Sequence, residues 1–139
     1  MRIDFSQVTP IYIQIADAIE DDILLGKLKE GEKCYSQVVL AKELNINPAT
    51  AAKGIRLLVE RGVLEKVRGQ AMTVKVGAMK EIKERKVEEI LGEIIERLVD
   101  EATKLGIGED ALVERVKEAV KRKSEKESRQ NGKTHDFRL

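Results

Sequence analysis

The sequence has few of the residue types on which disulfide-stapled, metal-bound or aromatic-rich folds depend. Its 139 residues include one cysteine, Cys34, and one histidine, His135. A single cysteine excludes an intramolecular disulfide and a cysteine zinc cluster. One histidine without companion ligands makes no metal site. Tryptophan is absent, and only two phenylalanines and two tyrosines occur, so we expect a mainly aliphatic core.

Membrane and catalytic signatures are missing as well. No apolar run approaches the roughly 20 residues that a spanning helix needs, and residues 1–5 do not begin a signal peptide. The sequence contains no Gly-rich phosphate loop and no nucleophile–histidine pairing in an ordered segment. We therefore expect a cytoplasmic protein without membrane contact that is not an enzyme and needs no cofactor or metal.

Charged residues are abundant, and their distribution is uneven. They make up 37% of the chain, yet the net charge is only +1. Residues 47–76 carry a net charge of +4, because six basic side chains oppose only Glu60 and Glu65, whereas residues 78–123 carry −1. A basic surface concentrated in one segment is typical of a nucleic-acid contact.

Residues 36–63 predict two short helices joined by a tight turn. Ser36 is a suitable N-cap for the first helix, and Asn45 ends it because asparagine tolerates the left-handed conformation. Asn47 then caps a second helix, and Pro48 occupies its first position, where the missing N–H costs nothing. Such a pair forms a helix–turn–helix, whose second helix enters a DNA major groove.

An amphipathic helix precedes this motif, and a hairpin follows it. Thr9 and Pro10 repeat the cap-and-proline pattern at the start of the first helix. Its apolar side carries isoleucines at every fourth position, namely Ile11, Ile15, Ile19 and Ile23. Its polar side carries Asp17, Glu20, Asp21 and Asp22. Residues 63–67 and 72–76 alternate as strands do, so the whole arrangement predicts a winged helix–turn–helix.

The composition changes after Gly77, where we predict a helical domain. Residues 79–105 form one helix of 27 residues, about 40 Å long, and Gly106 breaks it. We expect a last helix over residues 109–123 and no regular structure in residues 124–139, which are polar and lack periodicity. The predicted domains are therefore residues 1–77, 78–123 and a tail of residues 124–139.

An apolar stripe on these helices predicts a dimer seam. A helix of this length exceeds what one small domain covers, so part of the stripe is expected to meet a second copy. The alternative is that the stripe is simply the core of the helical domain. The residues expected at the seam are Val87, Leu91, Ile94, Leu98, Leu105, Leu112 and Val116.

Four motifs resemble the N-terminal domain of GntR-family transcription regulators. They are residues 10–15 (PIYIQI), residues 26–32 (GKLKEGE), residues 40–48 (LAKELNINP) and residues 60–64 (ERGVL). The Asn-Pro-x-Thr start of the reader helix, and the break within residues 105–112, are similar to the YtrA-type subfamily. The likeness covers nearly all of residues 8–122.

The resemblance implies a dimeric DNA-binding repressor with a short helical dimerisation domain, often acting on transporter genes. It implies DNA contacts by Ser36, Asn47, Thr50, Lys53, Arg68 and Gly69. Arg56 joins this set because it is basic and lies three residues after Lys53. Two positions depart from the family pattern: Val38 replaces an arginine, and Ala71 replaces the second glycine of the wing.

Together the sequence predicts a mainly α fold with a small β-hairpin, in which a winged helix–turn–helix precedes a helical dimerisation domain. We expect a homodimeric repressor of a nearby operon, bound to a double-stranded operator with inverted half-sites. Two alternatives remain open: a winged-helix module that binds protein, and an architectural DNA binder of low specificity. No residue identifies a small-molecule effector.

Overall fold

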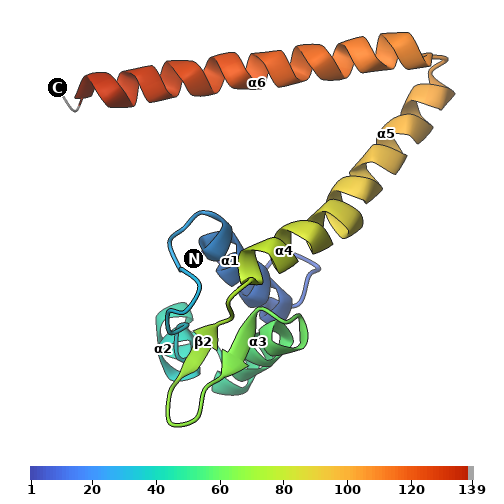
Figure 1. Cartoon of the computed structure of the whole chain (residues 1–139). Coiled ribbons are helices and arrows are strands. Elements are labelled where there is room, and N and C mark those ends of the chain that lie inside the picture. The colour runs from blue at the N-terminus through green and yellow to red at the C-terminus, as the bar shows by residue number, and fades with distance from the viewer. Residues whose placement is uncertain (138–139) are drawn as a thin grey trace. The chain divides into compact units, whose positions relative to one another are not determined.

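The computed structural model describes the backbone of residues 1–137 and the side chains of residues 1–130. These separate into two units, of which the first is Met1–Ile90 and the second begins at Leu91. The first unit comprises α1 (Ile11–Leu24), α2 (Gln37–Leu44), α3 (Pro48–Glu60), β1 (Leu64–Lys66), β2 (Met72–Val74) and α4 (Ala78–Lys86) (Figure 1). A π-helical segment, η1 (Val87–Leu91), precedes α5 (Gly92–Lys104) and α6 (Glu109–Phe137). The chain is thus mainly helical with one hairpin, as predicted.

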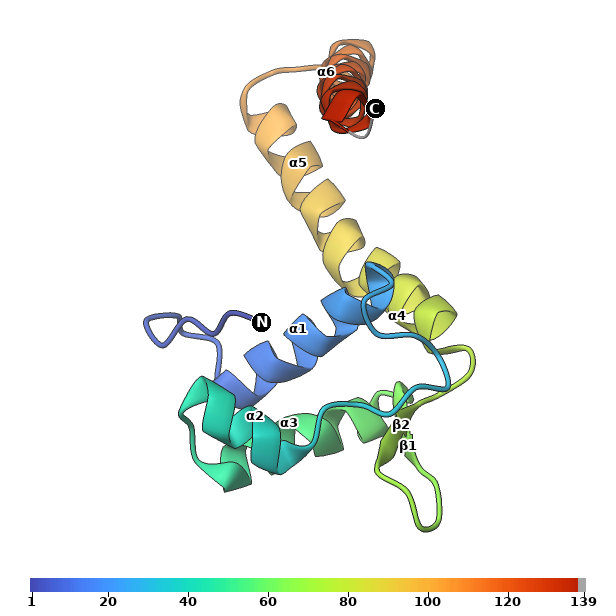
Figure 2. The ribbon, with the colours of Figure 1, turned by 90° about the vertical axis from the view of Figure 1, so that its left-hand side faces the viewer.

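Helix α1 is the centre of the first unit, and α3 and α4 both pack on it (Figure 2). The isoleucine repeat supplies this contact, since Ile15, Ile19 and Ile23 are fully buried. The same core includes Leu58 from α3 and Ile82 from α4. As expected from the composition, the core is aliphatic. Within the described part of the chain, no helix combines the length and apolarity needed to cross a membrane.

The turn between α2 and α3 forms as its sequence predicts. The Ser36 Oγ accepts a hydrogen bond from the Val39 N–H at 3.1 Å, and α2 ends at Asn45, whose φ of 53° is left-handed. The Asn47 Oδ1 accepts from the Ala49 N–H at 2.8 Å. These local hydrogen bonds pair backbone N–H groups at the helix starts that would otherwise lack an acceptor. The bond to Asn47 also fixes where α3 begins.

The wing is a short antiparallel hairpin whose register pairs Leu64 with Val74. A third segment, absent from the sequence prediction, completes it. The Cys34 N–H donates to the Met72 carbonyl at 2.7 Å, and the Val74 N–H donates to the Glu32 carbonyl at 2.9 Å. The chain before α2 therefore covers the free edge of β2, which anchors the hairpin to the helices.

A buried carboxylate joins three helices of this unit. Glu20 is fully buried, although the sequence assigned it to the polar side of α1. Its Oε1 accepts from Arg61 Nη1 at 2.9 Å, and its Oε2 accepts from Arg85 of α4. Burial raises the pKa of Glu20, and the guanidinium groups of Arg61 and Arg85 oppose that shift. Asp17 also accepts from Arg61, at 3.0 Å.

This cluster changes the predicted division of the chain. Helix α4 was assigned to the helical domain, with a boundary after Gly77. The structure instead divides after Ile90, because Ala78 and Ile82 are buried in the first core and Arg85 pairs with Glu20. The N-terminal unit therefore includes α4.

The second unit contains α5 and α6, separated by a turn at Gly106, whose φ is +70°. Helix α6 continues through Phe137, so the prediction that residues 124–139 lack regular structure is wrong for residues 124–137. Lysine, glutamate, arginine and glutamine dominate residues 121–130, and these are good helix formers even without an apolar face. Arg138 and Leu139 lie outside the described residues.

Candidate nucleic-acid interface

Helix α3 presents a basic outer face. Its inner side is buried at Ile55 and Leu58, and Thr50 is half-buried. Lys53 and Arg56 are both exposed and lie three positions apart, so they share one face. Neither forms an ion pair with any residue whose side chain is described. Cations that no carboxylate of the protein neutralises keep their charge available for phosphate.

The two capping residues, Ser36 of α2 and Asn47 of α3, are also exposed. Ser36 and Asn47 each use one side-chain oxygen to cap a helix. A hydroxyl and a carboxamide retain further hydrogen-bonding groups after one acceptor is used. Both residues can therefore cap a helix and contact a ligand at the same time.

The tip of the wing carries an exposed cation. Arg68 lies in the turn between β1 and β2, and Gly69 follows it with a φ of +77°, a conformation that favours glycine. The Gln70 N–H donates to the Val67 carbonyl at 2.9 Å and closes the turn. Ala71 is not among the described residues with positive φ. The turn therefore accommodates alanine at this position without backbone strain.

One arginine counted in the basic segment serves a structural purpose. Arg61 is bound to Asp17 and Glu20, so its charge is neutralised inside the domain. The basic side chains of residues 47–76 that stay exposed are Lys53, Arg56, Lys66, Arg68 and Lys75. Sequence counting alone overstated the charge available on this surface.

Helix α2 carries an exposed apolar side chain where the family pattern has arginine. Val38 is 69% exposed, and its neighbour Val39 is 48% exposed. Neither supplies a hydrogen bond to a phosphate, so α2 contributes less charge to this surface than the family pattern implies.

Cys34 and Tyr35 precede α2 and face inward. Burial raises the pKa of the Cys34 thiol to about 11, so this cysteine is mainly protonated at neutral pH. The Tyr35 hydroxyl donates to Asp22 Oδ2 at 2.7 Å, and burial together with that carboxylate raises the tyrosine pKa to about 12. No group of three or more potential metal ligands occurs among the described side chains, which do not include His135.

The residues expected at the dimer seam are mostly half-exposed in the single chain. Leu91, Ile94 and Leu98 are each 41–51% exposed, and Leu105 is 72% exposed. Val87 and Val116 are similarly exposed, and Leu112 is half-buried. Ile95 and Val99, which the predicted seam omits, are also 49% and 46% exposed. A wider apolar stripe along α5 would have included both residues.

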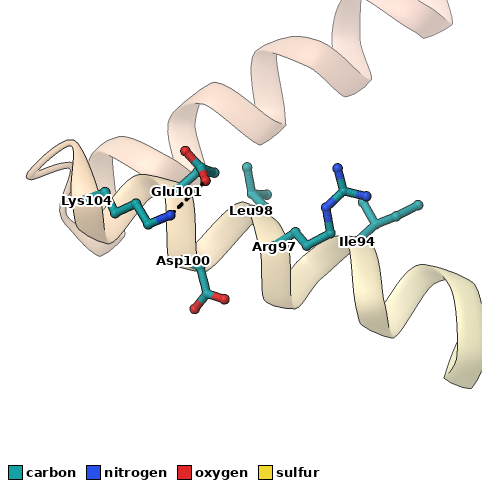
Figure 3. A pocket seen from close by; sticks show the side chains of 6 residues that line it. All are labelled: Ile94, Arg97, Leu98, Asp100, Glu101 and Lys104. Carbon is teal, nitrogen blue, oxygen red and sulfur yellow. Dashed lines mark hydrogen bonds and ion pairs between the residues drawn. The ribbon is translucent and has the colours of Figure 1, made fainter.

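Figure 3 shows how α5 mixes apolar and charged side chains along one hollow. Ile94 and Leu98 lie next to Arg97, and Lys104 is bound to Glu101 at 3.3 Å. A second hollow, between α5 and α6, is lined by Leu98, Leu112, Val113, Val116, Lys117 and Val120. The second unit therefore leaves a long apolar surface uncovered by its own side chains.

Comparisons with known proteins agree with this architecture. Residues 11–74 match the model of the bacterial regulatory proteins of the gntR family. Over 118 residues the chain is 30% identical to the HTH-type transcriptional repressor YtrA of Bacillus subtilis, covering 85% of this chain and 90% of that protein. This match includes the wing and most of the helical region, so the likeness extends beyond the DNA-binding motif.

Two further proteins are similar to this chain over a short region and over most of its length, respectively. The mannosyl-D-glycerate transport/metabolism system repressor MngR of Escherichia coli is 36% identical over 66 residues, which are 48% of this chain and 28% of MngR. A GntR family transcriptional regulator from Listeria monocytogenes has a similar structure, with a TM-score of 0.63 and 30% identity, covering 82% of this chain and 98% of that one.

Proposed function

Since this chain belongs to the GntR family of DNA-binding transcription regulators, we propose that it is a homodimeric repressor of a nearby operon. The observation that carries the proposal is the capped helix α3. It presents Lys53 and Arg56 beside the wing, both exposed and neither in an ion pair with a described side chain. In this family such regulators bind DNA rather than catalyse reactions.

The DNA-binding face is proposed to centre on the N-terminal half of α3. A helix that begins Pro-Ala-Thr-Ala-Ala has little side-chain bulk and can lie deep in a major groove. Lys53 and Arg56 then bind phosphates, and Thr50 and Asn47 contact bases or the backbone near the helix start. Ser36 adds a backbone contact from α2.

The wing supplies a second contact in this proposal. Arg68 and the backbone at Gly69 touch the phosphate backbone or the adjacent minor groove. Because Val38 replaces the arginine of the family pattern, α3 and the wing carry more of the electrostatic attraction than they do in relatives that retain it.

The dimer is proposed to form through the second unit. The half-exposed side chains of α5 and α6 form an apolar surface that is costly to leave in water. Pairing of two chains along Leu91, Ile94 and Leu98 covers it, and the flanking charges resemble those beside a helix–helix seam. A two-fold axis then predicts inverted half-sites separated by about 34–36 Å, or a multiple of that spacing.

Repression is proposed from the functions that the names of two relatives describe. YtrA of Bacillus subtilis and MngR of Escherichia coli are both named as repressors, and MngR is named for a transport and metabolism system. A dimer bound over a promoter blocks polymerase. A transporter operon next to this chain's own gene is the proposed target.

One specific feature favours a second candidate function. Val38 and Val39 present apolar surface on α2, where a DNA-binding helix usually presents polar groups. A winged helix of this kind can bind a protein partner instead of DNA.

Footprinting on the DNA upstream of the chain's own gene separates the possibilities. The repressor proposal predicts two protected half-sites in inverted orientation. Uniform weak protection along the duplex indicates an architectural binder, and no protection at micromolar protein concentration indicates the protein-binding alternative.

A further inference from the structure

An aromatic ring lies beneath one of the exposed cations of α3. The Lys53 Nζ is 4.1 Å from the centroid of the Tyr12 ring. Tyr12 is half-buried in the first turn of α1, whereas Lys53 is exposed. An ammonium group over an aromatic face is attracted by the ring's quadrupole. The ring therefore holds the charge above the surface of the domain, on the side that α3 presents to solvent.

The close approach of α1 and α3 makes this contact possible. Gly54 follows Lys53 and is buried against α1. A Cβ at Gly54 would lie 3.0 Å from Ile15 Cγ2 and 3.1 Å from the Tyr12 carbonyl oxygen. Both distances are shorter than ordinary van der Waals contact. The absence of a side chain at Gly54 thus lets α3 lie close enough to α1 for Lys53 to reach the ring.

A lysine held in this way differs from a free surface lysine. Its four-carbon stem has large rotamer entropy, part of which is lost whenever the ammonium binds a fixed phosphate. A ring that already restricts the stem reduces that loss. The ammonium has three donors, so one face can lie on the ring while N–H groups on the other side bind phosphate.

We propose that Tyr12 is a positioning residue for DNA binding: its ring holds the ammonium of Lys53 in place for a backbone phosphate. This inference rests on the proposed function, in which Lys53 binds DNA. It adds a residue of α1, outside the helix–turn–helix and the wing, to the groups that determine affinity.

Five proteins and one duplex test the inference. The duplex is taken from the DNA upstream of the chain's own gene. The proteins are the wild type, Tyr12→Phe, Tyr12→Leu, Lys53→Met and the double variant that combines Tyr12→Leu with Lys53→Met. Tyr12→Phe keeps the ring and removes the hydroxyl, whereas Tyr12→Leu keeps apolar bulk and removes the ring. Thermal unfolding by circular dichroism identifies any variant that fails to fold, and Tyr12→Met, which also removes the ring, replaces Tyr12→Leu in that case.

The ring is expected to contribute about two- to fivefold in Kd, the range for an exposed cation–π pair. Tyr12→Leu should weaken binding by that factor, and Tyr12→Phe should bind as wild type does. In the Lys53→Met background, Tyr12→Leu should have no further effect. Tyr12→Leu should also keep the wild-type salt dependence, because Lys53 still reaches the phosphate.

Three results would overturn the inference, and a fourth would refute the proposed DNA contact on which it rests. An equal loss from Tyr12→Leu with and without Lys53 would assign Tyr12 a merely structural role. A loss of affinity from Tyr12→Phe as large as that from Tyr12→Leu would assign the effect to the hydroxyl. Wild-type affinity in Tyr12→Leu would show that the ring makes no contribution to binding. Unchanged affinity in Lys53→Met would instead refute the proposed phosphate contact of Lys53.

Discussion

Replacing Glu20 by alanine should destabilise the N-terminal unit far more than replacing its neighbour Asp21. The two carboxylates are adjacent in α1, and each is bound to a cation of α4. Glu20 is fully buried between Arg61 and Arg85, whose side chains are only 19% and 18% exposed. Asp21 is 62% exposed and pairs with Lys86 at 3.0 Å. The pair is therefore a matched comparison of a buried and an exposed ion pair.

The magnitudes follow from what each substitution leaves behind. Glu20→Ala leaves two largely buried guanidinium groups, of which Arg61 retains Asp17, and breaking a buried pair of this kind costs about 3–5 kcal/mol. Asp21→Ala removes an exposed pair worth about 0–1 kcal/mol. Because a domain has only about 5–15 kcal/mol of stability, the first change is severe and the second is mild.

Urea unfolding followed by circular dichroism at 222 nm measures both free energies of unfolding. Protein concentration is held constant, because association through the second unit would shift the apparent stability. The expected difference between the two variants is about 3 kcal/mol or more. A Glu20→Ala variant within about 1 kcal/mol of Asp21→Ala would refute the cluster's role in joining α1, α3 and α4.

Three further predictions concern the seam, the helix contact and the cysteine. Leu98→Glu should convert the proposed dimer to monomers in sedimentation equilibrium. Thr103→Glu adds the same charge on the other side of α5 and should leave the dimer intact. Dimers in both variants would show that the seam lies elsewhere. Gly54→Ala should lower the free energy of unfolding by about 1 kcal/mol, since overpacking exceeds the gain in helix propensity; higher stability would contradict the close contact with α1. Alkylation of Cys34 by iodoacetamide at pH 8 should be at least about 100-fold slower in the native protein than in urea. The reason is that only about 0.1% of the native cysteine is thiolate at this pH, given its pKa of about 11. Comparable rates in the two conditions would contradict the burial of Cys34.

Features that depend on neighbouring residues were predictable from the sequence. Ser36, Asn45 and Asn47 define the ends of α2 and α3 through hydrogen bonds or a backbone conformation within a few residues. Such signals are local, so they can be recognised without knowledge of the tertiary structure. The prediction failed at Thr9, because α1 begins one residue later than expected and Pro10 occupies its N-cap without a side-chain bond.

Features that depend on distant residues were not predictable. Glu20 and Arg61 are 41 positions apart, and each looked like a solvent-facing charge on its own helix. The edge of β2 is covered by the segment that includes Glu32 and Cys34, for which no strand pairing was predicted. Only the packing of α1 against α3 and α4 reveals that an acidic residue, counted as surface, holds the unit together.

The proposed DNA-binding residues likewise include some that were predictable from the sequence and one that was not. The spacing of Lys53 and Arg56 was visible in the sequence because it follows the helical repeat. The ring of Tyr12 beneath Lys53 was not, since it requires α1 to approach α3 at Gly54. The sequence thus identified the cations, and the structure supplied the residue proposed to orient one of them.

The salt dependence of binding to the upstream duplex, compared with a shuffled duplex of equal length, tests the central claim most directly. If Lys53, Arg56 and Arg68 of both subunits bind phosphates, six contacts give a slope of log K against log salt of about −5. The account predicts this slope and at least a thousandfold preference for the upstream duplex at physiological salt. Equal affinity for both duplexes, or a slope near zero, would contradict a sequence-specific regulator that reads DNA through α3 and the wing.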